Sequence, residues 1–277
     1  MQPKAGWVAV LFAMTALLVP ASRATAATTA PRLRSRVAPS AASTTWSGEL
    51  LLDGFGGLHH VDTFGPVATA VFDAPSWPGW DIARGVALRA DQTGGFVLDG
   101  FGGLHWFSLG TRRRAPAVFG AAFWPGWDIA QGVALMPDGS GGFTVDGFGG
   151  LHWFSLGTPR RPPAVLDAPF WPGWDIARGV AILPDGSGGF VLDGWGAVHW
   201  FSIGSRRPAV RADPDAWRMG VDHACGLAFD SAQSAVLFDA DSGYLGFGVG
   251  PTAGPPGADW IAAPRLPDGV PIRDGAA

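Results

Sequence analysis

The stretch DGFGGLHWFSLG stands at Asp99–Gly110 and again, unchanged, at Asp146–Gly157. Related copies are DGFGGLH from Asp53, DGWGAVHWFSIG from Asp193 and the divergent DADSGYLGFG from Asp239. The aspartates that open these five copies are 46, 47, 47 and 46 residues apart. No helical stripe of apolar residues runs through any copy. Five copies at this period predict a β-propeller, in which each repeat supplies one small sheet that packs on its neighbours.

One repeat divides into four short segments, 132–136, 142–146, 151–156 and 164–170, each bounded by Gly, Pro or Asp as strands usually are. Nearly every position in these segments is apolar, which predicts sheets that are covered on both faces. We therefore expect an all-β fold, a five-bladed β-propeller built from four-stranded repeats of about 47 residues.

Closure of the ring can be predicted from the two ends of the repeat region. The first copy begins near Trp46 and lacks a preceding innermost strand. Near the other end, Asp259-Trp-Ile-Ala followed by Leu266-Pro-Asp-Gly resembles Trp174-Asp-Ile-Ala followed by Leu183-Pro-Asp-Gly, with fewer residues between the two parts. The sequence thus predicts that a C-terminal strand completes the first blade.

The first residues have the order of a secretory signal peptide: Lys4, an apolar run from Trp7 to Ala21, then the small residues Ala24-Thr-Ala. We expect residues 1–27 to be this signal, 28–43 to be a flexible leader, and 44–277 to form a single propeller domain. An uncleaved anchor is the alternative. A secreted protein, extracellular or associated with the cell surface and outside the membrane after cleavage, is the expectation.

Charge and cysteine content restrict the possible partners. The formal net charge is −4, and removal of Lys4 and Arg23 with the signal leaves 17 basic against 23 acidic residues, a formal charge of −6. Phosphate binding needs a concentrated basic face, so we expect no nucleic-acid partner. Cys225 is the only cysteine, so no internal disulfide can form. A buried inert thiol and a nucleophile assisted by His223 are both open at this point.

Antiparallel strands reverse at each turn, so alternate loops share a rim. The DGFGG turns and the links WPGWD, found in SWPGWDIA from Ser76 and in FWPGWDIA from Phe123 and Phe170, fall on one rim. The Pro-Asp-Gly-Ser turns and the Arg-rich loops after each FSLG fall on the other, where a solvated face is expected for the arginines. The candidate ligand-binding residues on the first rim are Trp80, Asp81, Arg84, Asp99, His105, Trp127, Asp128, Asp146, His152, Trp174, Asp175, Arg178, Asp193 and His199.

Each of these residues also has a structural interpretation. Pro then Gly in the link suits a type II turn, which leaves the flanking tryptophans to wedge between blades. Packing is the expected role of the first tryptophan of each link (Trp77, Trp124 and Trp171), while the second could pack or face a ligand. The spacing from Asp to His fits a hairpin with a three-residue loop, which would set the two side chains directly opposite each other.

Catalytic and metal chemistry have weaker support. The repeated histidines stand one blade apart, so no zinc cluster is expected, and Asp239-Ala-Asp-Ser-Gly lacks the terminal Glu of a calcium loop. We expect no cofactor. Glycosidases need two unlike carboxylates, which equivalent copies of one Asp do not provide. An enzyme is therefore the less favoured class, and its best candidates are Asp213, Asp215, Asp222, His223 and Asp230 in the divergent fifth repeat.

The unit as a whole resembles the tachylectin type of five-bladed lectin propeller in its period and strand layout. The matching pattern is Trp174, then Gly179-Val-Ala-Ile-Leu-Pro-Asp-Gly, Gly189-Phe-Val-Leu and Gly196-Ala-Val-His, and the resemblance extends from Trp46 to Gly269. It implies the fold and saccharide binding, but it identifies no individual site residue, because WPGWDIA and DGFGGLH match no sugar-contacting motif of that family. Tyr244 and Leu245 replace the apolar residue and His in the fifth copy, so five equal sites are not expected.

Three functional hypotheses follow. The first is a secreted, multivalent, lectin-like protein that binds a glycan or a cell-wall polysaccharide as a monomer. The second is a non-catalytic extracellular propeller with a structural role or a protein partner, and the third is a hydrolase that acts on polysaccharides. Burial of Trp80, Trp127 and Trp174 discriminates between the first two, because a sugar site needs an exposed aromatic face.

Overall fold

The computed structural model describes residues 33–37, 49–61, 69–212, 214, 216–229, 233–239 and 243–250. The chain divides into the units Met1–Ala30 and Pro31–Ala277, and all described residues belong to the second unit. The predicted signal peptide and the predicted C-terminal strand lie outside the described residues. Within the described part of the chain, no helix has the length and apolar character needed to cross a membrane.

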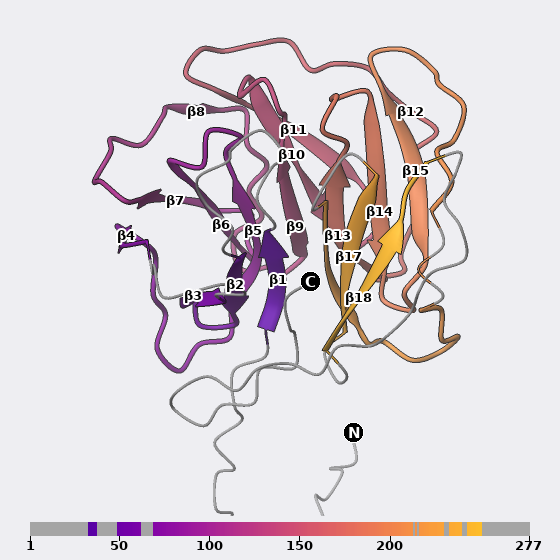
Figure 1. Cartoon of the computed structure of the whole chain (residues 1–277), viewed down its shortest axis with the longest axis horizontal. Helices are drawn as coiled ribbons and strands as arrows, with labels where there is room; N and C mark the ends of the chain where they lie inside the picture. The colour runs from indigo at the N-terminus through magenta and orange to yellow at the C-terminus, as the bar shows by residue number, and fades with distance from the viewer. Residues whose placement is uncertain are drawn as a thin grey trace, which may run out of the picture. The chain divides into compact units, whose positions relative to one another are not determined.

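The described strands form antiparallel sheets that follow one another along the chain (Figure 1). The first sheet has the order β1 (Leu33–Val37), β2 (Glu49–Asp53), β3 (Leu58–Val61). The second is β4 (Val71–Phe72), β7 (Leu104–Leu109), β6 (Gly94–Asp99), β5 (Ala83–Leu88), and the third is β8 (Val118–Phe119), β11 (Leu151–Leu156), β10 (Gly141–Asp146), β9 (Ala130–Leu135). The fourth is β12 (Val165–Leu166), β15 (Val198–Ile203), β14 (Gly188–Asp193), β13 (Ala177–Ile182), and the fifth is β16 (Ala224–Phe229), β17 (Ser234–Asp239), β18 (Gly243–Gly248). The fold is all-β and propeller-like, with repeated four-stranded sheets.

The fourth strand of each predicted repeat belongs to a different sheet from the one expected. The segment 164–170 was expected to complete the sheet that begins at residue 132, but β12 within it pairs with β15, where Val165 lies opposite Ile203. Each four-stranded sheet therefore takes its outer strand from the residues before its inner strand. The link with the WPGWD phrase then runs from the outer strand to the inner strand of the same sheet.

The inner position of the first sheet is occupied by β1. Leu33 pairs with Asp53 and a bulge follows before Ser35, as Ala83 pairs with Asp99 and a bulge follows before Gly85. The five residues of β1 lie inside 28–43, for which the sequence predicted a loose leader. Along the inner strands, β5 contacts β9, β9 contacts β13, β13 contacts β16, and β1 contacts both β5 and β16.

The hydrophobic core consists of separate clusters: four lie between consecutive sheets, and a small fifth one, which includes Val236 and Phe238, lies within the fifth sheet. One cluster joins Leu50 and Leu52 of the first sheet to Val97 and Phe107 of the second. Equivalent clusters lie between the second and third, the third and fourth, and the fourth and fifth sheets. Burial on both faces explains why the strands are apolar at nearly every position, as the sequence predicted.

Glycines allow the inner strands to approach one another closely. Gly85, Gly132 and Gly179 occupy the same register in β5, β9 and β13, and a Cβ built at Gly85 would lie 3.1 Å from the Cα of Gly132. A Cβ at Gly132 would lie 3.0 Å from the Cα of Gly179. Any larger residue would therefore push neighbouring sheets apart at this level.

Candidate binding site

The Asp-Gly-x-Gly turns are closed by the aspartate side chain. In the second sheet, Asp99 Oδ1 accepts the backbone N–H groups of Phe101 at 2.8 Å and Gly103 at 2.9 Å. Asp99 Oδ2 bonds to Nε2 of His105 at 2.8 Å. The same three contacts recur in the first, third and fourth sheets around Asp53, Asp146 and Asp193. The pairs are Asp53 with His59, Asp146 with His152, and Asp193 with His199.

The predicted register of these pairs is wrong, because the histidine does not lie directly opposite the aspartate. His105 lies opposite Val97 in the ladder, and the last paired residues are Leu98 and Leu104. Asp99 is two residues beyond Val97 on the same face, so His105 reaches the aspartate diagonally rather than across the strand pair. The bond from Asp99 N–H to Gly103 O closes a three-residue loop over residues 100–102, so the loop has the predicted length but begins one residue earlier than expected.

The environments of Asp99 and Asp53 favour the ionised carboxylate. Burial alone raises the pKa of Asp99, but the hydrogen bonds from His105, Gly103 and Phe101 outweigh it, and the pKa is lowered from its ordinary value. Burial and hydrogen bonds oppose each other in the same way at Asp53, where the pKa is also lowered. The carboxylates are mostly covered, whereas His105, His152 and His199 keep about a third of their side-chain surface exposed.

The first tryptophan of each link packs between two sheets, as the sequence predicted. Trp124 donates its backbone N–H to Phe101 O in the turn of the preceding sheet at 2.7 Å. Its ring meets His152 of its own sheet edge-on, with centroids 4.9 Å apart. Trp77 and Trp171 make the same contacts with His105 and His199. His105, His152 and His199 are thus each held by an aspartate and by a tryptophan, which supports a structural role for these three Asp–His pairs.

The second tryptophan of each link has a different environment. Trp80, Trp127 and Trp174 are 52%, 52% and 47% exposed. Each ring also packs against one aromatic ring of the turn in its own sheet, Trp80 on Phe101, Trp127 on Phe148 and Trp174 on Trp195, at centroid distances of 5.9, 6.0 and 5.2 Å. These contacts hold each indole in place while one side of it faces solvent.

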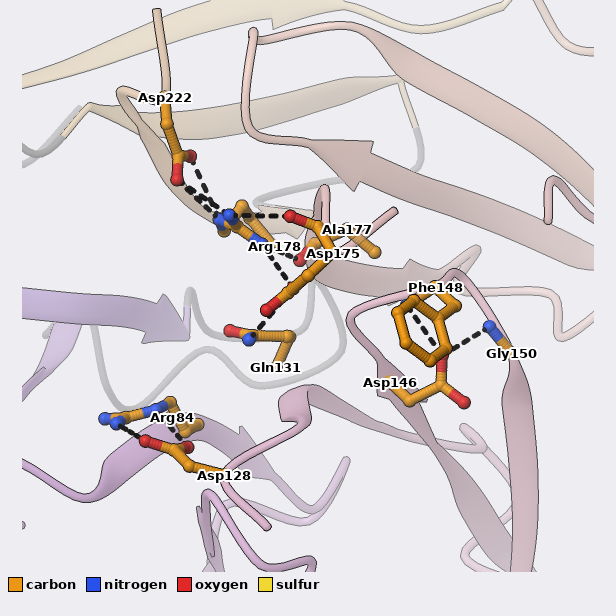
Figure 2. Close-up of polar contacts among 10 residues, drawn as sticks. All are labelled: Arg84, Asp128, Gln131, Asp146, Phe148, Gly150, Asp175, Ala177, Arg178 and Asp222. Carbon is orange, nitrogen blue, oxygen red and sulfur yellow. Dashed lines mark hydrogen bonds and ion pairs between the residues drawn. The ribbon is translucent and has the colours of Figure 1, made fainter. Parts of the chain in front are cut away.

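The link aspartates and the arginines that follow them join neighbouring sheets. Arg84 donates from Nε to Asp128 Oδ1 at 2.9 Å and from Nη2 to Asp128 Oδ2. Its other three N–H groups reach Asp81 Oδ1, Asp81 O and Ala83 O, so all five donors have acceptors. Arg178 makes the same fork to Asp222 and the same contacts to Asp175 and Ala177 (Figure 2). We call each such contact between an inner strand and the link aspartate of the next sheet a clamp.

The clamp between the third and fourth sheets is weaker. Gln131 has the register position of Arg84 and Arg178, and it reaches Asp175 Oδ1 only at 3.5 Å (Figure 2). The clamps also explain the glycine of each Asp-Gly pair, because a Cβ at Gly100, Gly147 or Gly194 would overlap Asp128, Asp175 or Asp222 respectively. Burial lowers the pKa of Arg178, but Asp222 and Asp175 outweigh it and the pKa is raised above its ordinary value.

The predicted site residues thus fall into two groups. The members of the first group, the Asp–His pairs with Arg84 and Arg178, already form hydrogen bonds within the protein. The link aspartates Asp128 and Asp175 also accept hydrogen bonds, from the side chains of the clamps. The second tryptophans offer open surface beside these aspartates. The sequence analysis did not identify Gln131 and Asp222 as members of the clamp series. Their positions, 47 residues after Arg84 and Asp175 respectively, indicate that they are equivalent to these residues. It also missed the turn rings Phe101, Phe148 and Trp195.

Within the described part of the chain, the catalytic candidates of the fifth repeat do not form a cluster. Asp222 is engaged by Arg178, and His223 is buried with Nε2 3.0 Å from Trp195 O. Asp213, Asp215 and Asp230 lie outside the described residues, as do Asp241 and Ser242 of the calcium-like segment. Among the residues that the structure describes, no three His, Cys, Asp or Glu side chains are grouped to hold a metal ion. Cys225 is buried in the fifth sheet.

Comparisons with known proteins add little to this description. No protein-family model matches the sequence, and no curated protein is significantly similar to it. Among solved structures, the chain is similar to a structural-genomics protein of unknown function from Bacteroides thetaiotaomicron, with 10% identity and a TM-score of 0.42. That match covers 80% of this chain and 70% of the other. The fold assignment rests on the sheets themselves, and these comparisons identify no lectin family.

Proposed function

We propose that this protein is a secreted, non-catalytic, glycan-binding propeller of the tachylectin type, with five blades in a closed ring. The observation that carries the proposal is the half-exposed state of Trp80, Trp127 and Trp174, each supported by an aromatic ring of the adjacent turn. Burial of these three indoles between blades would have removed the platform on which a sugar could stack.

Closure of the ring has two lines of support. The inner strand β1 contacts both β5 and β16, which belong to the second and the fifth sheets. In addition, Leu51 and Phe238 are fully buried although neither belongs to a core cluster between consecutive sheets. A first sheet packed on the fifth would bury both residues.

The chemistry of the rim fits a saccharide. Sugar rings present C–H groups that stack on aromatic faces, and their hydroxyls need fixed donors and acceptors. Each exposed indole is followed directly by an aspartate, and the side chains of Asp128 and Asp175 are 41% and 48% exposed while held by a clamp. A carboxylate held in this way can accept sugar hydroxyls at little entropic cost.

Several equivalent platforms suit a multivalent ligand. A single stacking site is weak, but simultaneous use of several sites raises the affinity for a polysaccharide without any new contact. A protein partner is the second candidate, and the 70% exposure of Met219 and the 60% exposure of Phe123 and Phe170 favour it.

The test is a glycan and cell-wall polysaccharide array probed with the secreted chain and with a Trp80→Ala, Trp127→Ala, Trp174→Ala triple variant. Phe119→Ala is the matched control, because Phe119 is an exposed aromatic residue outside these links. We expect binding by the wild type and the control, and loss of binding by the triple variant, which should still unfold cooperatively although loss of its ring contacts lowers its melting temperature. Absence of binding by the wild type would reject the glycan proposal and favour a protein partner.

A further inference from the structure

Exposed apolar side chains are concentrated in the links. Among the described residues, nine large hydrophobic side chains are exposed, and eight of them lie in the links 76–80, 123–127, 170–174 and 217–221. Phe119 is the exception. The six aromatic members of this group, which we call the aromatic arc, are Trp80, Phe123, Trp127, Phe170, Trp174 and Trp217. Exposed apolar side chains gathered in this way mark an interaction surface.

The aromatic arc is continuous from one sheet to the next, because links and turns alternate through direct contacts. Trp80 packs on Phe101, and Phe101 O accepts the N–H of Trp124, the residue next to Phe123. Trp127 packs on Phe148, whose carbonyl accepts the N–H of Trp171, next to Phe170. Trp174 packs on Trp195, whose carbonyl accepts the N–H of Arg218, next to Trp217.

We infer that the aromatic arc is a single track for one extended polysaccharide chain, rather than a set of separate pockets for terminal sugars. This inference rests on the proposed glycan binding. Among the described residues, the pocket lined by Gly85, Gln131, Gly132 and Arg178 is bounded by the closely packed inner strands and does not involve the arc. The arc therefore offers sugar rings successive stacking surfaces along its length.

The repetition of the surface favours a repetitive ligand. The exposed pair Phe123 and Trp127 recurs as Phe170 and Trp174, and the first and fourth links each keep one exposed ring, whereas the surface of a globular protein partner does not repeat. Aspartates also interrupt the arc: the side chains of Asp81, Asp128, Asp175 and Asp222 are 39%, 41%, 48% and 57% exposed. Charged residues are depleted from the centre of protein interfaces, and a second copy of this chain would set these carboxylates against one another.

The charge of the rim restricts the class of polysaccharide. Arg84 and Arg178 are the cations of the clamps, and both are engaged by the link aspartates. The four link aspartates outnumber these two arginines and the exposed Arg218 of the fourth link taken together, and the clamp between the third and fourth sheets has the neutral Gln131. A neutral or amine-bearing chain is therefore favoured, and a carboxylated or sulfated chain is repelled.

The arc is not uniform along its length. Ser76 replaces the phenylalanine of the first link, and Val221 replaces the second tryptophan of the fourth. Both aromatic rings are therefore present only in the second and third links, from Phe123 to Trp174. Trp195, which packs on Trp174, connects this part of the arc to Trp217. Trp127 and Trp174 lie in the interior of the track, so their loss should interrupt a bound chain, whereas loss of Trp80 should only shorten it.

The experiment is titration calorimetry of the full secreted chain with a length series of one neutral oligosaccharide that the array identifies, from monosaccharide to long oligomer. A single track predicts that affinity rises by about a hundredfold or more along the series, while the number of oligomers bound per protein falls toward one. Separate pockets predict constant affinity beyond a short oligomer and several ligands per protein, which would overturn the inference but leave glycan binding intact. No binding at any length would reject both.

Two variants and one control test the position of the track. Trp127→Ala should abolish most of the gain with length and leave monosaccharide binding little changed, and Trp80→Ala should have a smaller effect. Phe119→Ala should bind as the wild type does, and all three variants should remain folded at the temperature of the titration. Equal losses at all lengths, or tighter binding of a carboxylated oligomer than of its neutral counterpart, would contradict the proposal. Sedimentation that shows self-association abolished by Trp127→Ala would assign the arc to a second copy instead.

Discussion

At the scale of single residues, the clamps show how one position can decide the strength of a junction between sheets. An arginine fork can donate two parallel hydrogen bonds to a carboxylate, and Arg84 and Arg178 both do so. Gln131 has one amide group at the same position, and its contact with Asp175 is long. The junction between the third and fourth sheets is therefore held by fewer polar contacts than its neighbours.

Substitution of Gln131 by arginine should strengthen this junction. We expect Gln131→Arg to raise the free energy of unfolding by about 1 kcal/mol, because Asp175 is partly exposed and solvent weakens the new ion pair. Urea denaturation at neutral pH measures the change. Gln131→Lys is the control, since it adds the same charge without the fork, and it should gain less. An equal gain in both variants would show that charge alone, and not the fork, stabilises the junction.

The Asp99–His105 pair makes stability depend on pH through the carboxylate of Asp99. Because the pKa of Asp99 is lowered in the folded protein, its contribution is fully present above the unfolded value of about 3.9 and is lost as the pH falls through the folded pKa. Asp99→Asn should cost about 2 kcal/mol at neutral pH, since charged acceptors make stronger hydrogen bonds. Denaturation across a pH series should show this difference shrinking at acid pH. A difference that stayed constant down to the lowest pH would rule out the carboxylate charge as its cause.

At the scale of elements, the contact between a turn and the next link depends on one glycine. Gly149 has φ of +86°, and a Cβ there would lie 2.9 Å from Cε3 of Trp171 and 3.0 Å from Pro169 O. The turn can thus adopt its conformation and receive the tryptophan only if this residue has no side chain.

Alanine scanning of the two adjacent glycines tests this requirement. We expect Gly149→Ala to lower the free energy of unfolding by about 2 kcal/mol, from backbone strain together with displacement of Trp171. Gly150→Ala is the matched control, because Ala197 occupies the equivalent position in the fourth sheet and keeps its 2.9 Å hydrogen bond to Asp193. Thermal unfolding should separate the two variants clearly. Similar melting temperatures would mean that the turn tolerates a side chain at both positions.

Much of the element level could be predicted from the sequence, for identifiable reasons. Gly and Asp bound the strands, so the predicted 142–146 and 151–156 agree with β10 and β11 to within a residue. The outer strand has two paired residues, and nothing local in 164–170 indicates which sheet it joins. The clamp partners are 44 residues apart, so Arg84 and Asp128 could be predicted to share a rim but not to bind each other. The exposure of the second tryptophan also depends on contacts between residues that are distant in the sequence, so the sequence alone could not predict it.

At the scale of the whole molecule, the proposed closed ring makes the first sheet essential to the fifth. The sequence predicted that a C-terminal strand beginning near Asp259 would complete the first sheet. In the structure the inner position beside β2 is held by β1, which also contacts β5 and β16. Loss of β1 would leave β2 without its inner partner and remove a contact from two other sheets.

Two truncations distinguish these alternatives. A chain that begins at Thr44 lacks β1, and we expect its melting temperature to fall by roughly 10 °C, since each kcal/mol shifts Tm by about 2–4 °C in a domain of this size. A chain that begins at Pro31 keeps β1 and is the control, with an expected Tm close to that of the chain that begins at residue 28. A chain that ends at Gly250 should lose less stability than the one that begins at Thr44, because it keeps every described strand. Calorimetry on the three chains provides the comparison. If the C-terminal truncation were the more damaging one, the strand predicted near Asp259 would have to be the inner strand of the first sheet, with β1 displaced from that position.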